Sequence, residues 1–365
     1  MKIVCISAAQ IPSDTANSIQ VMKVCQAFAQ VGHAVKLLVP GEQPSDISQQ
    51  QLQNHYGLKV PFPIEWLATR NRRLFPWKAA WRAGRMQADL LYAWPLQSAV
   101  LGLLSGKASM LELHDFPSGH FGPLWLRLFL IFPGRKRCLP ITDALRRALR
   151  LPEGQTVVAP DGLDMERYRD LPEADSARRQ LNLAEAPTVL CTGHLYTGRG
   201  GDLFLRLAEK FPQARFVWVG GRPADVEAWK GRAANLTNVS FSGFVPNERI
   251  PLYQSAADVL LMPYGLAVTT SSGGNTAGIC SPMKMFEYMA AGRAILTSDL
   301  PVLREVLDET MAVFSPPEQV DAWESALGGL LADRQRRQTL GQRARRAVEQ
   351  YSWVKRAQRV LEGFG

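Results

Sequence analysis

Two segments of this 365-residue chain carry residue types suited to holding an anionic ligand. The first, residues 193–202, reads Gly-His-Leu-Tyr-Thr-Gly-Arg-Gly-Gly-Asp and follows a short apolar run. A glycine-rich turn between a strand and a helix presents backbone N–H groups and the positive end of the helix to an anion. Arg199 adds a guanidinium whose fork fits phosphate oxygens. The segment matches neither a P-loop nor a nicotinamide fingerprint, and a purely structural turn is the alternative.

The second segment, residues 281–293, has the features of a helix that starts beside a ligand. Ser281 is the expected N-cap, Pro282 the expected first helical residue, and Gly292 the expected end of the helix. Glu287 lies among methionine and phenylalanine side chains, where a carboxylate is costly unless it has a partner. Vicinal hydroxyl groups, such as those of a ribose, could supply that partner. The structural alternative is a surface glutamate on an amphipathic helix.

A histidine provides the third candidate group. His114 follows the apolar run 110–113 and precedes Asp115 and Pro117. In open α/β sheets, ligands bind at the carboxyl ends of the strands, which is where this run would place the ring. We therefore treat His114 as a candidate binding-site residue, with a structural histidine as the alternative.

Short β-branched and aliphatic runs alternate with helical stretches along the chain, a pattern that predicts right-handed βαβ units and parallel sheets. The pattern restarts after a polar, acidic stretch near residues 170–177. We expect an α/β fold of two doubly wound, Rossmann-like domains facing a central cleft, residues 1–160 and 161–349, with a helix over about 350–365 that packs back on the first. The expected strands are 3–7, 34–39, 90–93, 110–113, 139–142 and 156–159, then 188–192, 214–219, 239–242, 259–262, 294–297 and 311–314.

The composition is that of a packed, reduced protein. The chain is 46% hydrophobic and 21% charged, which excludes a disordered or fibrous protein. Its five cysteines form no C-x-x-C pair, which argues against a zinc ribbon and predicts reduced thiols in the cytoplasm. We find no signal peptide, and no apolar run reaches the ~18 residues that a membrane span needs.

The positive charge is concentrated in the first half of the chain. Residues 1–160 hold 18 Lys and Arg against 9 Asp and Glu, and so carry the whole net charge of +9. Two segments there, 66–85 and 121–137, mix cations with tryptophan, phenylalanine and leucine, as interfacial helices do. An anionic membrane surface is therefore a candidate partner, at the inner face of the membrane. Core helices with solvated basic faces are the alternative; no nucleic-acid signature accompanies the charge, so we expect no nucleic-acid partner.

Together these segments resemble the family-4 retaining glycosyltransferases (glycosyl transferases group 1), which have the GT-B fold of two facing Rossmann-like domains. The resemblance extends over essentially the whole chain. It is most specific in residues 281–292 and continues through 299–306. Further matches are residues 160–164, 193–200, 239–244 and 351–353.

The resemblance implies three catalytic residues. Glu287 would bind the ribose hydroxyls of a nucleotide-sugar donor, Arg199 the diphosphate, and His114 would lie beside the transferred sugar. The family often has a second glutamate eight residues earlier, where this chain has Ile279. Either that role is lost, or Asn275 or the Ser/Thr-rich loop supplies the contact instead. The implied substrate-binding residues are Asn17, Ser18, Gly193, His194, Gly198, Gly243, Phe244, Ser281, Pro282, Met283 and Lys284.

The function implied by this resemblance is transfer of a hexose from a UDP- or GDP-sugar to an acceptor hydroxyl, with retention at the anomeric carbon. The acceptor would be a glycan, a lipid or a small molecule, such as a lipid-linked glycan precursor. The resemblance implies no cofactor and no metal ion, and the sequence shows no Asp-x-Asp metal motif. The alternatives are a non-catalytic homologue that binds a nucleotide-sugar, and a nucleotide-sugar epimerase of the same fold.

Overall fold

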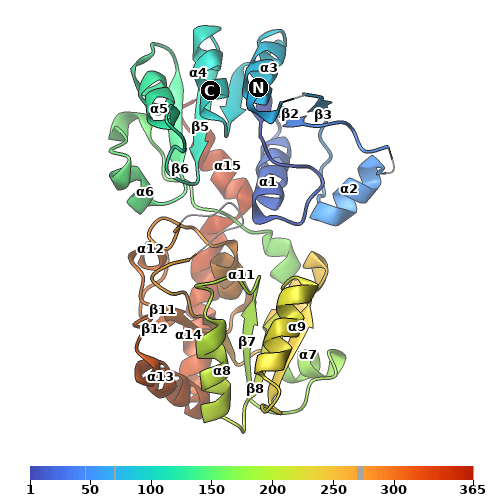
Figure 1. The fold of residues 1–365 in the computed structure, drawn as a ribbon, viewed down its shortest axis with the longest axis vertical. Helices are drawn as coiled ribbons and strands as arrows, with labels where there is room; N and C mark the ends of the chain where they lie inside the picture. The colour runs from blue at the N-terminus through green and yellow to red at the C-terminus, as the bar shows by residue number, and fades with distance from the viewer. Residues whose placement is uncertain (46, 70, 269–274, 365) are drawn as a thin grey trace. The chain divides into compact units, whose positions relative to one another are not determined.

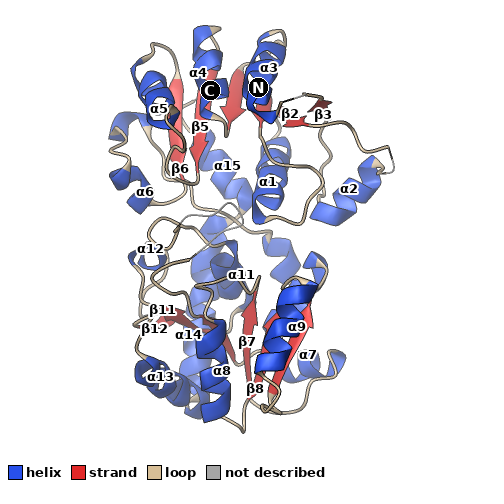
Figure 2. Ribbon diagram, viewed as in Figure 1, coloured by secondary structure: helices blue, strands red, loops and turns tan. Residues whose placement is uncertain are grey.

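In the computed structural model the chain divides into two compact units, each built on one six-stranded parallel sheet (Figure 1). The first unit comprises Met1–Asp161 and Trp353–Gly365, and the second comprises Gly162–Ser352. The structure describes residues 1–45, 47–69, 71–268 and 275–364. Both sheets have helices between successive strands (Figure 2), which confirms the predicted doubly wound α/β architecture.

The sheet of the first unit has the strand order β3-β2-β1-β4-β5-β6. The chain winds outward from β1 to β2 and β3, and then returns to the other side of β1 at β4. The loops after β1 and β4 therefore leave the sheet at its topological switch point, where ligands of such sheets bind. The strands are β1 (Lys2–Ile6), β2 (Ala34–Pro40), β3 (Ile64–Leu67), β4 (Leu90–Ala93), β5 (Ala108–Leu113) and β6 (Lys136–Pro140).

The helices of this unit form two groups. Helix α4 (Leu96–Leu104) packs between α3 (Phe75–Gly84) and α5 (Gly122–Ile131), while α1 (Ala16–Gln30) packs against the C-terminal helix α15 (Trp353–Leu361). Because the crossovers from β1 and from β4 run in opposite directions across the sheet, right-handed connections place α1 and α4 on opposite faces. The shorter helices are α2 (Gln49–Tyr56) and α6 (Asp143–Ala148).

Two elements of this sheet differ from the expectation. The edge strand β3 was not predicted; its four residues are mostly half-exposed and show no clear alternation. Residues 156–159 were predicted as a strand but are not one. They contact β6 through a single bridge at Thr156 and two backbone hydrogen bonds. The run is short and stops at Pro160, which has no N–H group to continue a ladder.

The second unit has the strand order β12-β11-β10-β7-β8-β9, so its switch point lies between β7 and β10. All six strands expected here are present, with ends that differ by at most one residue from those predicted. They are β7 (Thr188–Thr192), β8 (Arg215–Val219), β9 (Val239–Gly243), β10 (Val259–Met262), β11 (Ala294–Ser298) and β12 (Ala312–Ser315). The helices are α7 (Ala174–Gln180), α8 (Gly201–Lys210), α9 (Pro223–Arg232), α10 (Ile250–Ser255), α11 (Met283–Ala291), α12 (Pro301–Arg304), α13 (Val320–Ala332) and α14 (Arg334–Ala347).

Helix α11 confirms one predicted boundary and corrects the other. It ends at Gly292, which takes the left-handed conformation (φ +66°) that the prediction required of it. It begins at Met283 with Pro282 at the N-cap, so the prediction of Ser281 as N-cap was wrong by one residue. The extended backbone of Pro282 (ψ 119°) explains the shift, because a first helical residue would need a helical ψ.

Candidate functional site

Two cationic side chains converge on one tyrosine at the switch point of the second sheet. Arg199 lies in the turn between β7 and α8, and Lys284 lies in the first turn of α11. Arg199 Nη1 donates a hydrogen bond to the hydroxyl of the buried Tyr264 at 2.5 Å, and its guanidinium lies 4.8 Å from the ring centre. Lys284 Nζ lies 4.6 Å from the centre of the same ring. The arrangement places two positive charges beside the carboxyl ends of β7 and β10, where an anion would be attracted.

Glycines let the two loops at this switch point pack directly on each other. Gly265 N donates to Gly198 O at 2.9 Å. A Cβ atom on Gly198 would lie 1.8 Å from the carbonyl oxygen of Ala267, and one on Gly200 would lie 2.1 Å from that of Pro263. Both glycines have positive φ, +80° and +84°. Glycine is therefore required at both positions for two reasons: the backbone has a positive φ, and another loop lies too close for a side chain.

A substitution in this turn should destabilise the second unit. Gly198→Ala is expected to lower the free energy of unfolding by roughly 1–3 kcal/mol, because it combines a positive φ with a backbone clash. The matched control is Gly231→Ala on α9, where a Cβ atom meets nothing within 4 Å and φ is not positive. Urea unfolding of both variants measures the difference. An equal effect at the two positions would contradict the packing described here.

Glu287 is half-buried in the second turn of α11 and has one weak hydrogen-bond partner among the residues that the structure describes. Its Oε2 accepts from Gln254 Nε2 at 3.4 Å, and Gln254 in turn accepts from the buried Tyr168 hydroxyl at 2.9 Å. Burial raises the pKa of Glu287, although Arg167, Gln254 and Lys284 act in the opposite direction. A half-buried carboxylate with acceptor capacity left over is suited to a pair of ligand hydroxyls.

The other predicted substrate-binding residues of the second unit lie on the same edge of the sheet. Gly193 and the exposed His194 begin the turn after β7, and the imidazole of His194 stacks on Tyr196 with ring centres 4.9 Å apart. Gly243 ends β9, and Phe244 follows it with its ring 67% exposed. Ser281 is buried, while Pro282 and Met283 are half-exposed at the start of α11.

The position of the family's second glutamate is buried and apolar here. Ile279 is 5% exposed and precedes α11. The side chain of Asn275, the suggested substitute, is bound to the backbone: its Oδ1 accepts from Val268 N and Ala277 N, both at 3.0 Å. The Ser/Thr-rich residues 269–274, the other suggested substitute, lie outside the described residues.

His114 belongs to a buried charge network in the first unit. It follows β5, and its Nε2 lies 2.8 Å from Oε1 of the buried Glu112. Arg356, on the C-terminal helix α15, donates from Nη2 to the same oxygen at 2.8 Å and from Nε to Pro160 O at 2.9 Å. The Tyr92 hydroxyl also donates to Glu112. The network fixes the ring of His114, whose side chain remains 31% exposed.

The charges of this network stabilise one another. Burial alone would raise the pKa of Glu112, but Arg356, His114 and Tyr92 lower it to about 2. Burial would lower the pKa of His114, but the hydrogen bond and charge of Glu112 raise it above its usual value. An ionised carboxylate can only accept, so Nε2 of His114 carries the proton of this hydrogen bond while Glu112 is ionised. Nδ1 is then the ring nitrogen left for a ligand.

The two residues predicted near the start of the chain have different surroundings. Asn17 is exposed in the first turn of α1, which follows the switch-point loop after β1. Ser18 is buried, and its hydroxyl donates to the carbonyl oxygens of Ser13 and Thr15. The side chain of Ser18 thus holds the loop itself, and its backbone N–H donates to the hydroxyl of Thr15, the N-cap of α1, at 3.4 Å.

Glu112, His114 and Asp161 form a cluster whose potential ligand atoms lie within 4.8 Å of one another. Its chemistry suits a guanidinium rather than a divalent metal. Oε1 of Glu112 already receives both Arg356 and His114 at 2.8 Å, and the fixed positive charge of Arg356 would repel a cation. Burial raises the pKa of Asp161 to about 6, although His114 and Arg356 oppose the shift. In this structure the cluster is a charge network.

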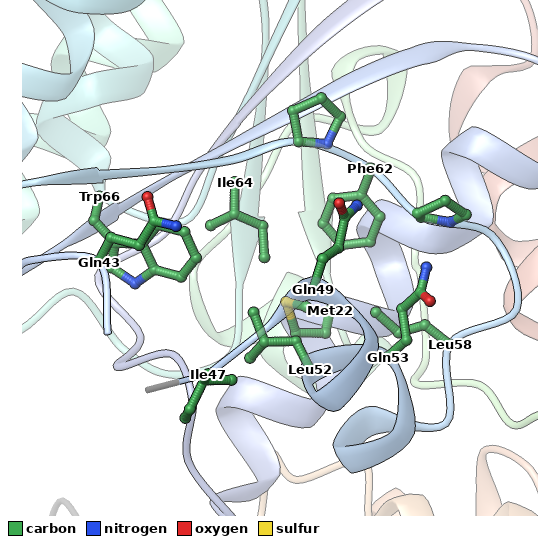
Figure 3. Close-up of a pocket in the computed structure, with 12 residues that line it drawn as sticks. Met22, Gln43, Ile47, Gln49, Leu52, Gln53, Leu58, Phe62, Ile64 and Trp66 are labelled. Carbon is green, nitrogen blue, oxygen red and sulfur yellow. The ribbon is translucent and has the colours of Figure 1, made fainter. Parts of the chain in front are cut away.

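A separate cavity of about 200 Å³ lies in the first unit (Figure 3). Leu52 and the amides of Gln49 and Gln53 come from α2 and its flank, and Ile64 and Trp66 from β3. None of the predicted site residues lines it.

Sequence reasoning missed the residues that support the candidates. Tyr264 comes two residues after β10, so the strand-end rule that selected His114 could have selected it as well. Glu112 carries a signal too, since a glutamate inside an otherwise apolar strand needs a partner. Arg356 could not have been found, because nothing local links it to a residue 244 positions away.

Comparisons with known proteins show what the chain is similar to in sequence and in fold. Residues 186–333 match the family described as glycosyl transferases group 1. The GDP-mannose-dependent alpha-(1-6)-phosphatidylinositol monomannoside mannosyltransferase of Mycolicibacterium smegmatis is 29% identical over 213 residues, which cover 56% of this chain and 54% of that protein. The phosphatidyl-myo-inositol mannosyltransferase of the same organism is 31% identical over 150 residues, covering 40% and 36%. The chain thus spans about half, or less, of the length of the curated relatives that it matches.

Solved structures resemble the chain over its full length. Anabaena Alr3699/HepE in complex with UDP superposes with a TM-score of 0.77 at 17% identity, covering 100% of this chain and 99% of that one. Sucrose-phosphate synthase from Thermosynechococcus elongatus superposes with a TM-score of 0.75 at 19% identity, covering 100% and 98%. At these identities the likeness shows the fold alone, and that fold is GT-B. The chain therefore has the GT-B fold, and its residues 186–333 are similar to the family described as glycosyl transferases group 1.

Proposed function

We propose that this protein is a retaining glycosyltransferase that moves a hexose from a UDP- or GDP-sugar to an acceptor hydroxyl. The observation that carries the proposal is the pair of cations, Arg199 and Lys284, held by Tyr264 at the switch point of the second sheet. A diphosphate carries the charge that such a pair attracts, and Glu287 on the following helix suits ribose hydroxyls. The similarity to this family and the relatives' recorded mannosyltransferase activities support the same reaction class.

The difficult step is departure of the nucleoside diphosphate as the sugar becomes oxocarbenium-like. The bond from the anomeric carbon to the phosphate oxygen breaks, and the acceptor oxygen bonds to that carbon from the same face, its proton passing to the departing phosphate. Arg199 and the N-terminal N–H groups of α8 stabilise the leaving charge. This route needs no nucleophilic carboxylate and no metal ion in our proposal.

The first unit takes the acceptor side of the reaction in this proposal, and the second takes the donor. His114 is assigned to the transferred sugar, with Nδ1 as the contacting atom. A lipid-linked or membrane-proximal glycan precursor is the proposed acceptor, because the basic and aromatic segments lie in the first unit. No described helix is long and apolar enough to span a bilayer.

The donor can be identified by thermal shift with a panel of UDP-, GDP- and ADP-sugars. A sugar nucleotide that binds the native state raises the melting temperature, by an amount that grows with its concentration over Kd. We expect one UDP- or GDP-sugar to do so, and to release its nucleoside diphosphate when a suitable glycolipid acceptor is added. No shift with any nucleotide or sugar nucleotide would contradict the proposal.

Product analysis separates the alternatives. Sugar analysis after incubation without acceptor detects an epimerase, which would convert the donor into its stereoisomer. Binding without nucleoside diphosphate release under any acceptor would indicate a non-catalytic homologue, for which the absent family glutamate at Ile279 is the supporting observation.

A further inference from the structure

We propose that the outer face of α3, α4 and α5 is a docking surface for an anionic lipid bilayer. Ten large apolar side chains are exposed among the described residues, and eight of them lie between residues 74 and 131. They belong to these three helices and to the loops beside them. They are Leu74, Trp77, Trp81, Leu104, Phe116, Phe121, Leu124 and Ile131. We name the surface of these three helices the three-helix face.

The exposed side chains follow the helical repeat. On α5, Leu124, Arg127 and Ile131 point outward while Leu126 and Phe129 are buried, so this helix is apolar on nearly all sides. On α3, Trp77 and Trp81 lie one turn apart and are 46% and 59% exposed. A surface helix of a soluble protein normally presents a polar outer face. The exposed sides of α3 and α5 are therefore more apolar than the water-facing side of a surface helix normally is.

The three helices form one continuous surface. Helix α4 packs between α3 and α5, and the three lie together over the same part of the first unit (Figure 1). The Ser98 hydroxyl on α4 donates to Pro76 O on α3 at 2.9 Å. Trp77 on α3 contacts Trp125 on α5 edge-to-face, with ring centres 5.5 Å apart. These contacts join the exposed apolar side chains into one patch instead of leaving them scattered singly. Contiguous apolar patches of this kind mark interaction sites.

The positive charge of the three-helix face indicates which partner binds it. Helices α3, α4 and α5 contain no aspartate or glutamate, whereas Lys78 and Arg127 lie on them and Arg85 caps α3. Arg82, also on α3, is paired with Glu65 at 2.6 Å and does not count toward this charge. Lys78 and Arg127 are exposed, and the guanidinium of Arg85 lies 4.3 Å from the centre of the Trp81 ring. Tryptophan beside cations suits the headgroup region of a bilayer, where rings enter the interface and cations pair with anionic lipid. A second copy of this face would bring like charges together, which disfavours self-association.

Vesicle co-sedimentation of the full chain tests this inference without reference to catalysis. We expect binding to vesicles of phosphatidylcholine with 30% phosphatidylglycerol, weaker binding in 0.5 M salt, and little binding to phosphatidylcholine alone. The variant Lys78→Gln/Arg85→Gln/Arg127→Gln should lose about fivefold in affinity for each cation removed. The variant Trp81→Ser/Leu124→Ser should lose the apolar part of the binding, which is the part that remains in 0.5 M salt.

Matched controls lie in the second unit. Helix α14 carries the exposed cations Arg336, Arg343 and Arg346 without exposed large apolar neighbours, so their replacement by glutamine should leave vesicle affinity within twofold. Leu266→Ser removes a side chain 56% exposed elsewhere and should have no effect. Circular dichroism melts verify that each variant is folded.

Three outcomes would overturn the inference. They are absence of binding to anionic vesicles, equal binding to neutral and anionic vesicles, and equal losses in the α14 variant. A concentration-dependent dimer that the Trp81→Ser/Leu124→Ser variant abolishes would assign the face to a second copy of the chain instead. Vesicle binding needs no sugar donor. A protein that does not bind vesicles could therefore still be a transferase, and a protein without transferase activity could still bind vesicles.

Discussion

Replacing Arg199 with alanine is expected to lower kcat/KM for the sugar nucleotide by about 10²–10³-fold, the usual effect of removing one charge-stabilising donor from a reaction centre. The guanidinium is held by Tyr264 and by the packed turn, so in the proposed reaction it would meet the diphosphate without reorganising. Most of the loss should fall on kcat, because charge on the leaving diphosphate grows toward the transition state. Steady-state release of nucleoside diphosphate measures both constants.

Three variants make this prediction specific. Arg199→Lys keeps the charge but loses the planar fork, and should recover part of the activity. Glu287→Gln should raise KM for the donor, because the ribose hydroxyls lose their ionised acceptor. Arg206→Ala, an exposed arginine on α8, is the matched control and should change neither constant. Full activity of both Arg199→Ala and Glu287→Gln would remove the site assignment.

Removing Arg356 should have the largest effect on stability. The Arg356→Met variant would leave Glu112 buried without its main counter-charge, which costs roughly 3–5 kcal/mol in comparable buried pairs. Urea unfolding should therefore show a large fall in the midpoint of the first unit. The pair Arg147–Asp143 provides the control, since the Arg147 side chain is 75% exposed and Arg147→Ala should leave the midpoint almost unchanged. Similar midpoints for the two variants would contradict the proposed role of the network.

The network also sets a pH dependence. Glu112 has a depressed pKa, so its stabilisation is complete above its unfolded value of 4.5 and is lost as pH falls toward about 2. His114 has a raised pKa, so its stabilisation is complete below 6.5 and is lost as pH rises through the folded value. Asp161 has a pKa raised to about 6, so its stabilisation is complete below 3.8 and is lost as pH rises through about 6. The combined contribution of these three groups to the stability of the wild type should therefore be highest at about pH 3.8–4.5, and Arg356→Met should flatten the acid limb.

The sequence predicted the local features of this protein and missed the long-range ones. The six strands of the second sheet follow from apolar runs between helices, and the turn at Arg199 follows from its glycines. Strand β3 escaped because a half-exposed edge strand of four residues has little periodicity. The N-cap of α11 was misplaced by one residue because serine and proline both favour helix starts.

The site was predictable only as separate parts. Arg199, Lys284 and Glu287 were identified from their own segments. Their supporting residues come from elsewhere, since Tyr264 follows β10 and Gln254 lies on α10. His114 was selected from its strand end, whereas the arginine that fixes its partner comes from the last helix. Contacts of that kind depend on strand order and helix packing, which apolar periodicity does not encode.

A crystal structure of the protein with UDP or GDP bound tests the central claim most directly. We predict that the phosphate oxygens lie within hydrogen-bond distance of Arg199 or Lys284, and that both ribose hydroxyls face the carboxylate of Glu287. A nucleotide seated elsewhere on the chain, or one whose phosphates and ribose avoid these three side chains, would contradict the account.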